Sequence, residues 1–208
     1  MLSVEELVQA LSFGYEVRGF ELKRPGPRTD THLFAKVTRA ALSMANLRDG
    51  GHIIIGVDDK DPVAMLPGLS AEDLASWLSY DDVSRKLAEY ADPPLHFDIA
   101  ARALSTGADV ALLQVHEFAD IPVLCAKDFP EVLRKGACYV RPRRVPETAE
   151  IPSAVEMRDL LQLATEKALR AFVETAARSG IELVTPEQAD DVRERAAERF
   201  SAQREQTW

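Results

Sequence analysis

Acidic side chains and one lysine gather around two short apolar segments in the first third of the chain. Glu16, Glu21 and Lys23 lie within eight residues of one another, and Asp58 and Asp59 follow directly on the second segment. Carboxylates are the hard oxygen ligands that Mg²⁺ and Mn²⁺ prefer, and such an ion can activate water beside a phosphodiester. These residue types therefore predict a Mn²⁺ or Mg²⁺ site with hydrolytic chemistry.

Strand geometry explains how these side chains could meet. Residues two apart on a strand project to the same face, so Glu21 and Lys23 should point together while Phe20 and Leu22 face the core. If the second segment, residues 52–57, pairs with this strand, the two aspartates leave its end near Glu21. Lys23 could then orient water or offset charge on a phosphate, as in nucleases that use an acid-x-lysine pair.

Simpler explanations of the same residues stay open. Acidic residues are common in turns that follow strands, so Asp58-Asp59 is also ordinary turn chemistry. The pair Gly50-Gly51 could let backbone approach a phosphate, but it equally suits the end of a helix, which we favour. Gly51 and Gly56 have the glycine spacing of a P-loop, yet Val57 and Asp58 stand where that motif needs Lys and Ser or Thr.

Net charge limits how the protein could bind nucleic acid. The 208-residue chain has a formal net charge of −9, whereas proteins that bind nucleic acid over a broad surface are usually basic. A contact would need a local basic patch, and the segment 127–144 is the candidate, with Arg141, Arg143 and Arg144 at its end. The alternative is that these cations form a solvated loop.

The remaining composition favours a cytoplasmic protein. Cys125 and Cys138 do not form a disulfide framework or a Cys/His cluster, and the N-terminus lacks the basic start of a signal peptide. The chain has no apolar run long enough to cross a bilayer, so we expect no membrane association.

The pattern of apolar residues predicts alternating helices and strands. We expect strands at 20–24, 52–57, 95–100, 109–116, 122–125 and 137–141, and helices at 3–13, 32–46, within 70–92, 153–178 and 186–204. This mixed order predicts an α+β fold with a single mixed, mostly antiparallel sheet flanked by helices, and a C-terminal helical appendage. The expected boundary separates residues 1–152 from residues 153–208.

Several of these residues resemble the Schlafen-type AlbA domain family, over roughly Glu16 to Leu161. The matching positions are Glu16, Glu21-Leu22-Lys23, Ala45-Asn46 with Gly50-Gly51, Gly56-Val57-Asp58-Asp59, and Tyr139-Val140-Arg141. Two departures stand out. Leu22 replaces the usual phenylalanine, and Leu47-Arg48-Asp49 lengthens the link before the glycines, which should alter packing rather than chemistry.

The resemblance implies binding of nucleic acid, with RNA favoured over DNA, and metal-dependent endoribonuclease activity on structured, transfer-RNA-like substrates. Glu16, Glu21 and Asp59 would hold Mn²⁺ or Mg²⁺ with Asp58 in reserve, and Lys23 would steady the scissile phosphate. Arg141, Arg143 and Arg144 would bind the nucleic-acid backbone. The alternatives are a non-catalytic DNA-binding or regulatory module, whose carboxylates are structural, and an interaction domain that docks a partner.

We also expect a homodimer. Vertebrate relatives of the family place two such lobes in one chain as a clamp, and a twofold dimer would restore the second lobe here. Apolar residues of the helix from about Ser153 could face the partner or pack on the protein's own sheet; these are Val155, Leu160, Leu163, Leu169 and Phe172.

Overall fold

A computed structural model describes residues 18–57, 67–104, 107–143, 147–181 and residue 195. Residues 1–165 form one compact unit and residues 166–208 a second. The expected helices at 3–13 and 186–204 lie outside the described residues, as do Glu16, Asp58, Asp59 and Arg144.

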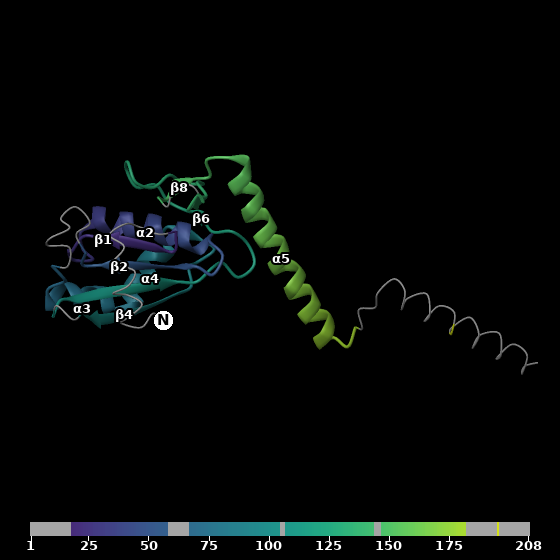
Figure 1. Ribbon diagram of the computed structural model, residues 1–208, viewed down its shortest axis with the longest axis horizontal. Helices are drawn as coiled ribbons and strands as arrows, with labels where there is room; N and C mark the ends of the chain where they lie inside the picture. Colours follow the sequence, from purple (N-terminus) through teal and green to yellow (C-terminus); the bar gives the residue numbers. More distant parts are fainter. Residues whose placement is uncertain (1–17, 58–66, 105–106, 144–146, 182–194, 196–208) are drawn as a thin grey trace, which may run out of the picture. The chain divides into compact units, whose positions relative to one another are not determined.

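A four-stranded mixed sheet forms the centre of the first unit (Figure 1). Its strands are β1 (Phe20–Lys23), β2 (Gly51–Ile55), β4 (Phe97–Ala103) and β5 (Asp109–Val115), in the order β1-β2-β5-β4. β1 and β2 are parallel, and the other two pairs are antiparallel. The predicted α+β fold with a mostly antiparallel sheet is therefore confirmed.

Four shorter strands form two separate ladders beside this sheet. β3 (Ala91–Asp92) pairs with β6 (Leu124–Cys125), and β7 (Tyr139–Val140) pairs with β8 (Ala149–Glu150). β6 and β7 were expected from their apolar residues, whereas β3 and β8 were not. β3 and β8 are two residues long and have no apolar run around them, so only pairing with a distant partner defines them as strands.

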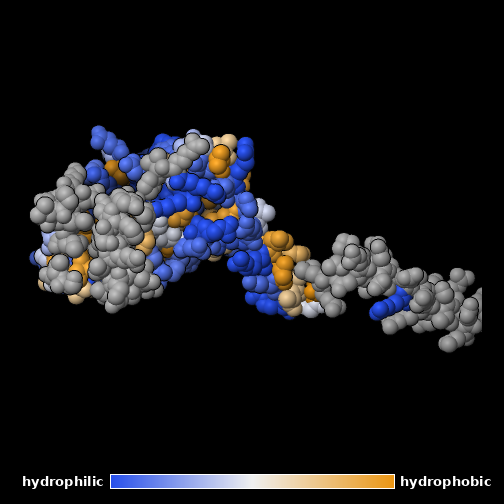
Figure 2. Space-filling model, viewed as in Figure 1, coloured by the Kyte–Doolittle hydropathy of each residue, from blue (hydrophilic) through white to orange (hydrophobic). Residues whose placement is uncertain are grey.

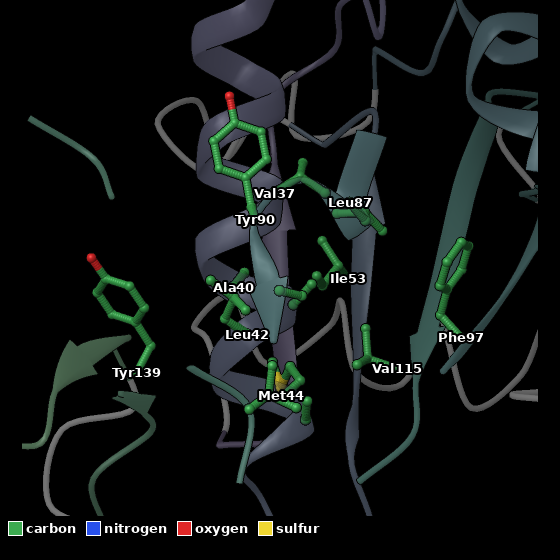
Figure 3. Packing of buried hydrophobic residues seen from close by; sticks show 14 of the residues in the cluster. Val37, Ala40, Leu42, Met44, Ile53, Leu87, Tyr90, Phe97, Val115 and Tyr139 are labelled. Carbon is green, nitrogen blue, oxygen red and sulfur yellow. The ribbon is translucent and has the colours of Figure 1, made fainter. Parts of the chain in front are cut away.

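Helix α2 (Thr31–Ala45) connects β1 to β2 and packs on their shared face. The Asp30 carboxylate caps it by accepting hydrogen bonds from the backbone N–H groups of His32 and Leu33, each at 3.0 Å. α2 is buried on most of its surface (Figure 3), since it contacts both the sheet strands and β7, and Val37, Leu42 and Met44 are at most 1% exposed. This burial is the main force that holds α2 on the sheet.

Two short helices also pack against the main core. They are α3 (Ala71–Leu78), which contacts β4 and β5, and α4 (Tyr80–Ala88), which contacts β3. Trp77 of α3 is fully buried, stacks on Phe34 of α2 and donates a hydrogen bond of 2.9 Å to the carbonyl of Gly26. A bulky indole with its N–H satisfied is a stable core residue.

The two faces of the sheet carry separate apolar clusters. Ile53 and Ile55 of β2 belong to the main cluster under α2, whereas Ile54 belongs to a smaller cluster with Phe20 and Leu22. The register sets Glu21 beside Ile53 and Lys23 beside Ile55, so both charged residues project toward the face that carries α2. Phe20 and Leu22 face the core of the opposite side, as expected.

The last described helix, α5 (Ala154–Arg178), runs through the boundary between the two units. Its first turns belong to the first unit, where Leu160 and Leu163 are each 5% exposed within the main cluster. No helix in the described part of the chain combines the length and the apolar character needed to span a bilayer.

Candidate functional site

Glu21 and Lys23 contact each other on β1, as strand geometry predicted. The Lys23 ammonium donates to Oε1 of Glu21, and the Arg141 guanidinium donates through Nη1 to Oε2 of the same carboxylate. Glu21 is 8% exposed and Arg141 only 1% exposed. The predicted catalytic acid is therefore part of a buried ion-paired cluster, with one oxygen on each cation.

Arg141 also secures the edge strand through its backbone contacts. Its Nη2 donates to the carbonyl of Phe20 at 2.9 Å, while its own carbonyl accepts a hydrogen bond of 2.8 Å from Nε of Arg18. Because Arg141 is buried, its guanidinium has no surface on which a nucleic-acid phosphate could lie. In this arrangement Arg141 is structural, and a phosphate contact would have to come from its neighbours.

The residues at Glu21 do not fit a divalent metal in this arrangement. A metal ligand needs a free lone pair directed at the ion, but both Glu21 oxygens face cations that would repel Mg²⁺ or Mn²⁺. Within the described ranges, no group of three or more His, Cys, Asp or Glu side chains could hold a metal ion. The predicted convergence of Glu16, Asp58 and Asp59 with Glu21 falls outside these ranges.

An arginine-lined pocket opens next to this cluster. We name it the arginine pocket; its cavity is about 230 Å³ and it is lined by Arg18, Asn46, Arg48, Val140, Arg141, Arg143, Glu156, Asp159, Leu160, Gln162 and Leu163. Its four arginines come from three segments: the stretch just before β1, the link after α2, and the stretch after β7. Arg18, Arg48 and Arg143 are exposed.

Partial burial and the neighbouring positive charge together perturb one arginine of the arginine pocket. The pKa of Arg18 is lowered, first because its guanidinium is partly withdrawn from water, although the residue as a whole is exposed, and next because Arg143 is near. Asp159 and Glu156 act in the opposite direction. Guanidinium groups crowded in this way favour an anion between them.

Asn46 lines the arginine pocket and connects three parts of the chain. Its amide donates to the carbonyls of Val123 and Tyr139 at 2.8 and 2.9 Å and accepts a 2.8 Å hydrogen bond from the backbone N–H of Val123. Asn46 also ends α2 as its C-cap. This buried amide fixes β7, and with it the arginines that follow, against α2.

Gly50 and Gly51 have structural roles. Gly50 has a φ of +71°, and a Cβ placed there would lie 2.1 Å from the Val115 carbonyl oxygen. A Cβ on Gly51 would lie 2.1 Å from the Met44 sulfur. The helix itself ends earlier, at Ala45, so the glycines are needed for close packing at the start of β2 rather than to stop the helix.

Four charged residues of the arginine pocket were not selected from the sequence. They are Arg18, Arg48, Glu156 and Asp159. Arg48 lies in the lengthened link before Gly50, where a change in packing alone had been expected. The spacing of Glu156, Asp159, Leu160 and Leu163 was a usable signal, because these positions share one face of a helix and the leucines identify that face as buried.

Comparisons with known proteins provide little further information. No family model matches the chain, and no curated protein matches it. Among solved structures, the chain is similar to the DIP2311 protein from Corynebacterium diphtheriae, with 15% sequence identity and a TM-score of 0.46. The match covers 71% of this chain and 26% of that one, so the chain spans about a quarter of the length of that protein.

Proposed function

We propose that this protein binds nucleic acid, with RNA preferred over DNA, and that phosphate groups enter the arginine pocket. The observation that carries the proposal is that three exposed arginines, Arg18, Arg48 and Arg143, come from three separate segments and line one cavity in a chain of net charge −9. An acidic protein repels a polyanion over most of its surface, so productive contact requires a local concentration of cations of this kind.

The chemistry of the pocket suits phosphate. Arginine presents a planar fork of N–H donors that matches two phosphate oxygens, and it stays charged at every physiological pH. Arg18, Arg48 and Arg143 supply the exposed guanidinium groups, while Arg141 holds the base of the pocket through its pairing with Glu21. The preference for RNA is supported by the resemblance to the Schlafen-type AlbA family alone.

Titration of fluorescent transfer RNA, single-stranded RNA and duplex DNA at several salt concentrations tests the proposal. The variant Arg48→Gln/Arg143→Gln removes two exposed cations of the pocket, and Arg85→Gln/Lys36→Gln removes two exposed cations elsewhere. We expect the pocket variant to weaken binding and to lower the slope of log K against log salt by roughly 0.7–0.9 for each lost phosphate contact. Equal effects of the two variants would refute the assignment.

The same titration separates the alternatives. Tighter binding of DNA than of RNA would favour a DNA-binding or regulatory module, and binding of neither would favour a domain that docks a protein partner. Metal-dependent endoribonuclease activity stays a prediction, and incubation of transfer RNA with Mn²⁺ tests it. Cleavage should then be lost in Asp59→Asn, which removes one of the predicted metal ligands and keeps the size of the side chain.

A further inference from the structure

Two carboxylates of α5 face the arginines of the pocket. Asp159 Oδ2 lies 2.9 Å from Nη2 of Arg143, and Glu156 lines the same cavity one turn earlier. Both acids counteract the lowering of the Arg18 pKa that partial burial and then the neighbouring arginines cause. The charges in the pocket are therefore partly compensated from within the chain.

The first turns of α5 hold these acids in position. Leu160 and Leu163 anchor the helix in the main core, and Glu156 and Asp159 occupy the same helix face. At the start of the helix, the Ser153 hydroxyl contacts the Glu156 carboxylate and accepts a 3.2 Å hydrogen bond from the backbone N–H of Val155. This capping arrangement holds the Glu156 side chain at the first turn of α5, which is the part of the helix that lines the pocket.

Carboxylate and phosphate compete for the same donors. A guanidinium that donates to Asp159 has fewer N–H groups to offer a phosphate oxygen, and the negative charge of both acids repels a polyanion. The pair formed by Arg143 and Asp159 is nonetheless readily broken, because their side chains are 68% and 35% exposed. Exposed ion pairs of this kind contribute little to stability, typically about 0–1 kcal/mol.

We propose that Glu156 and Asp159 act as an internal competitor that occupies the arginine pocket until a phosphate group displaces Asp159 from Arg143. This inference rests on the proposed function and adds a regulation of the same site. The competitor reduces affinity for short or weakly charged anions, whereas a ligand with several adjacent phosphates overcomes it. Affinity is thereby set by α5 as well as by the arginines.

The variant Glu156→Gln/Asp159→Asn removes both charges while it keeps the size of the side chains. We expect it to bind transfer RNA and single-stranded RNA about 3- to 30-fold more tightly than the unmodified protein at low salt, with the difference shrinking as salt rises. The control Glu72→Gln/Asp81→Asn makes the same change in net charge at exposed positions of α3 and α4. It should improve binding far less.

Further measurements separate failure of this inference from failure of the proposed function. If the Glu156→Gln/Asp159→Asn variant bound RNA through the arginines with unchanged affinity, the inference that these acids compete with phosphate would be refuted. The proposed function would stand. Binding of no nucleic acid by any form would overturn both. If the double variant unfolds, Asp159→Asn alone should still tighten binding and Asp159→Glu should restore ordinary affinity; tight binding by Asp159→Glu would refute the competition.

Discussion

The buried pairing of Glu21 with Arg141 has consequences for stability at the residue scale. Glu21→Ala leaves a guanidinium that is 1% exposed without its carboxylate partner, and removal of one member of a buried ion pair typically destabilises a protein by about 3–5 kcal/mol. We expect a loss of this size in the free energy of unfolding, measured with urea. The double variant Glu21→Gln/Arg141→Met should lose less than the sum of its single changes.

A loss below about 1 kcal/mol for Glu21→Ala would show that Glu21 is not required for folding. That outcome would again make Glu21 a candidate for the predicted metal-binding and catalytic role.

The two cysteines should react slowly in the native protein. Burial raises the pKa of Cys138 to about 11, and it also raises the pKa of Cys125. A thiol with a raised pKa favours folding below the pKa of the unfolded chain, about 8.5, and this contribution is lost as pH rises toward the native value. At pH 8 roughly 0.1% of Cys138 would be thiolate, against about a quarter of an unfolded cysteine.

The rate of reaction with a disulfide reagent at pH 8 checks this expectation. In Cys125→Ser, which isolates Cys138, the native protein should react at least about 100-fold more slowly than the protein in urea. Similar rates in the two states would mean that Cys138 is accessible and that burial does not control its ionisation.

At the element scale, the join between α2 and β2 depends on one glycine. Gly50→Ala places a Cβ 2.1 Å from the Val115 carbonyl oxygen and strains a backbone with a φ of +71°. Gly107 is a matched control, since its φ is +80° but nothing lies within 4 Å of its would-be Cβ. We expect Gly107→Ala to destabilise by about 1 kcal/mol and Gly50→Ala by more than about 3 kcal/mol.

Thermal or urea unfolding of the two variants measures this difference. Equal destabilisation would mean that the left-handed backbone, rather than the contact with β5, accounts for the glycine at position 50.

The elements could be predicted from sequence where a local pattern exists. The apolar stripe of α2 and the β-branched run of β2 identify a helix and a buried strand, because each pattern reflects burial along a single segment. β8 has no such pattern, since its two residues are strand only through pairing with β7.

The site was less predictable than the fold. The pairing of Glu21 with Lys23 follows from strand geometry, but the pairing of Glu21 with Arg141 joins residues that are 120 positions apart. Arg18, Arg48 and Arg143 line one cavity, where Asn46 holds β7 against α2 and Arg18 bonds to the Arg141 carbonyl. Convergence of this kind is a tertiary property that spacing along a sequence does not reveal.

At the scale of the whole molecule, the predicted homodimer depends on hydrophobic residues of α5. Leu160 and Leu163 are buried in the protein's own core, so they cannot face a partner. Val155 of the first unit is 56% exposed, and Leu169 and Phe172 of the second are 61% and 59% exposed. Figure 2 shows hydrophobic residues at the surface of α5. Exposed apolar side chains at helical spacing are suited to a second copy of the same helix.

Light scattering during size exclusion measures the mass directly. A dimer would have twice the 23.0 kDa of the chain, and Leu169→Glu/Phe172→Glu should reduce it to a monomer. Arg170→Glu, on the same helix, is a control that should leave the mass unchanged. A monomer at micromolar concentration would refute the dimer and with it the expected two-lobed clamp.

The distance along the chain between Glu21 and Arg141 also has a consequence for biosynthesis. At about 5–20 residues per second, a ribosome needs roughly 6–24 s to add the 120 positions that separate the acid from its buried partner. During that interval β1 can pair with β2 and Lys23 can pair with Glu21, but the second carboxylate oxygen of Glu21 still lacks its buried partner Arg141. β1 is the first strand of this sheet to be synthesised, but its buried ion pair with Arg141 is therefore among the last contacts of the sheet to form.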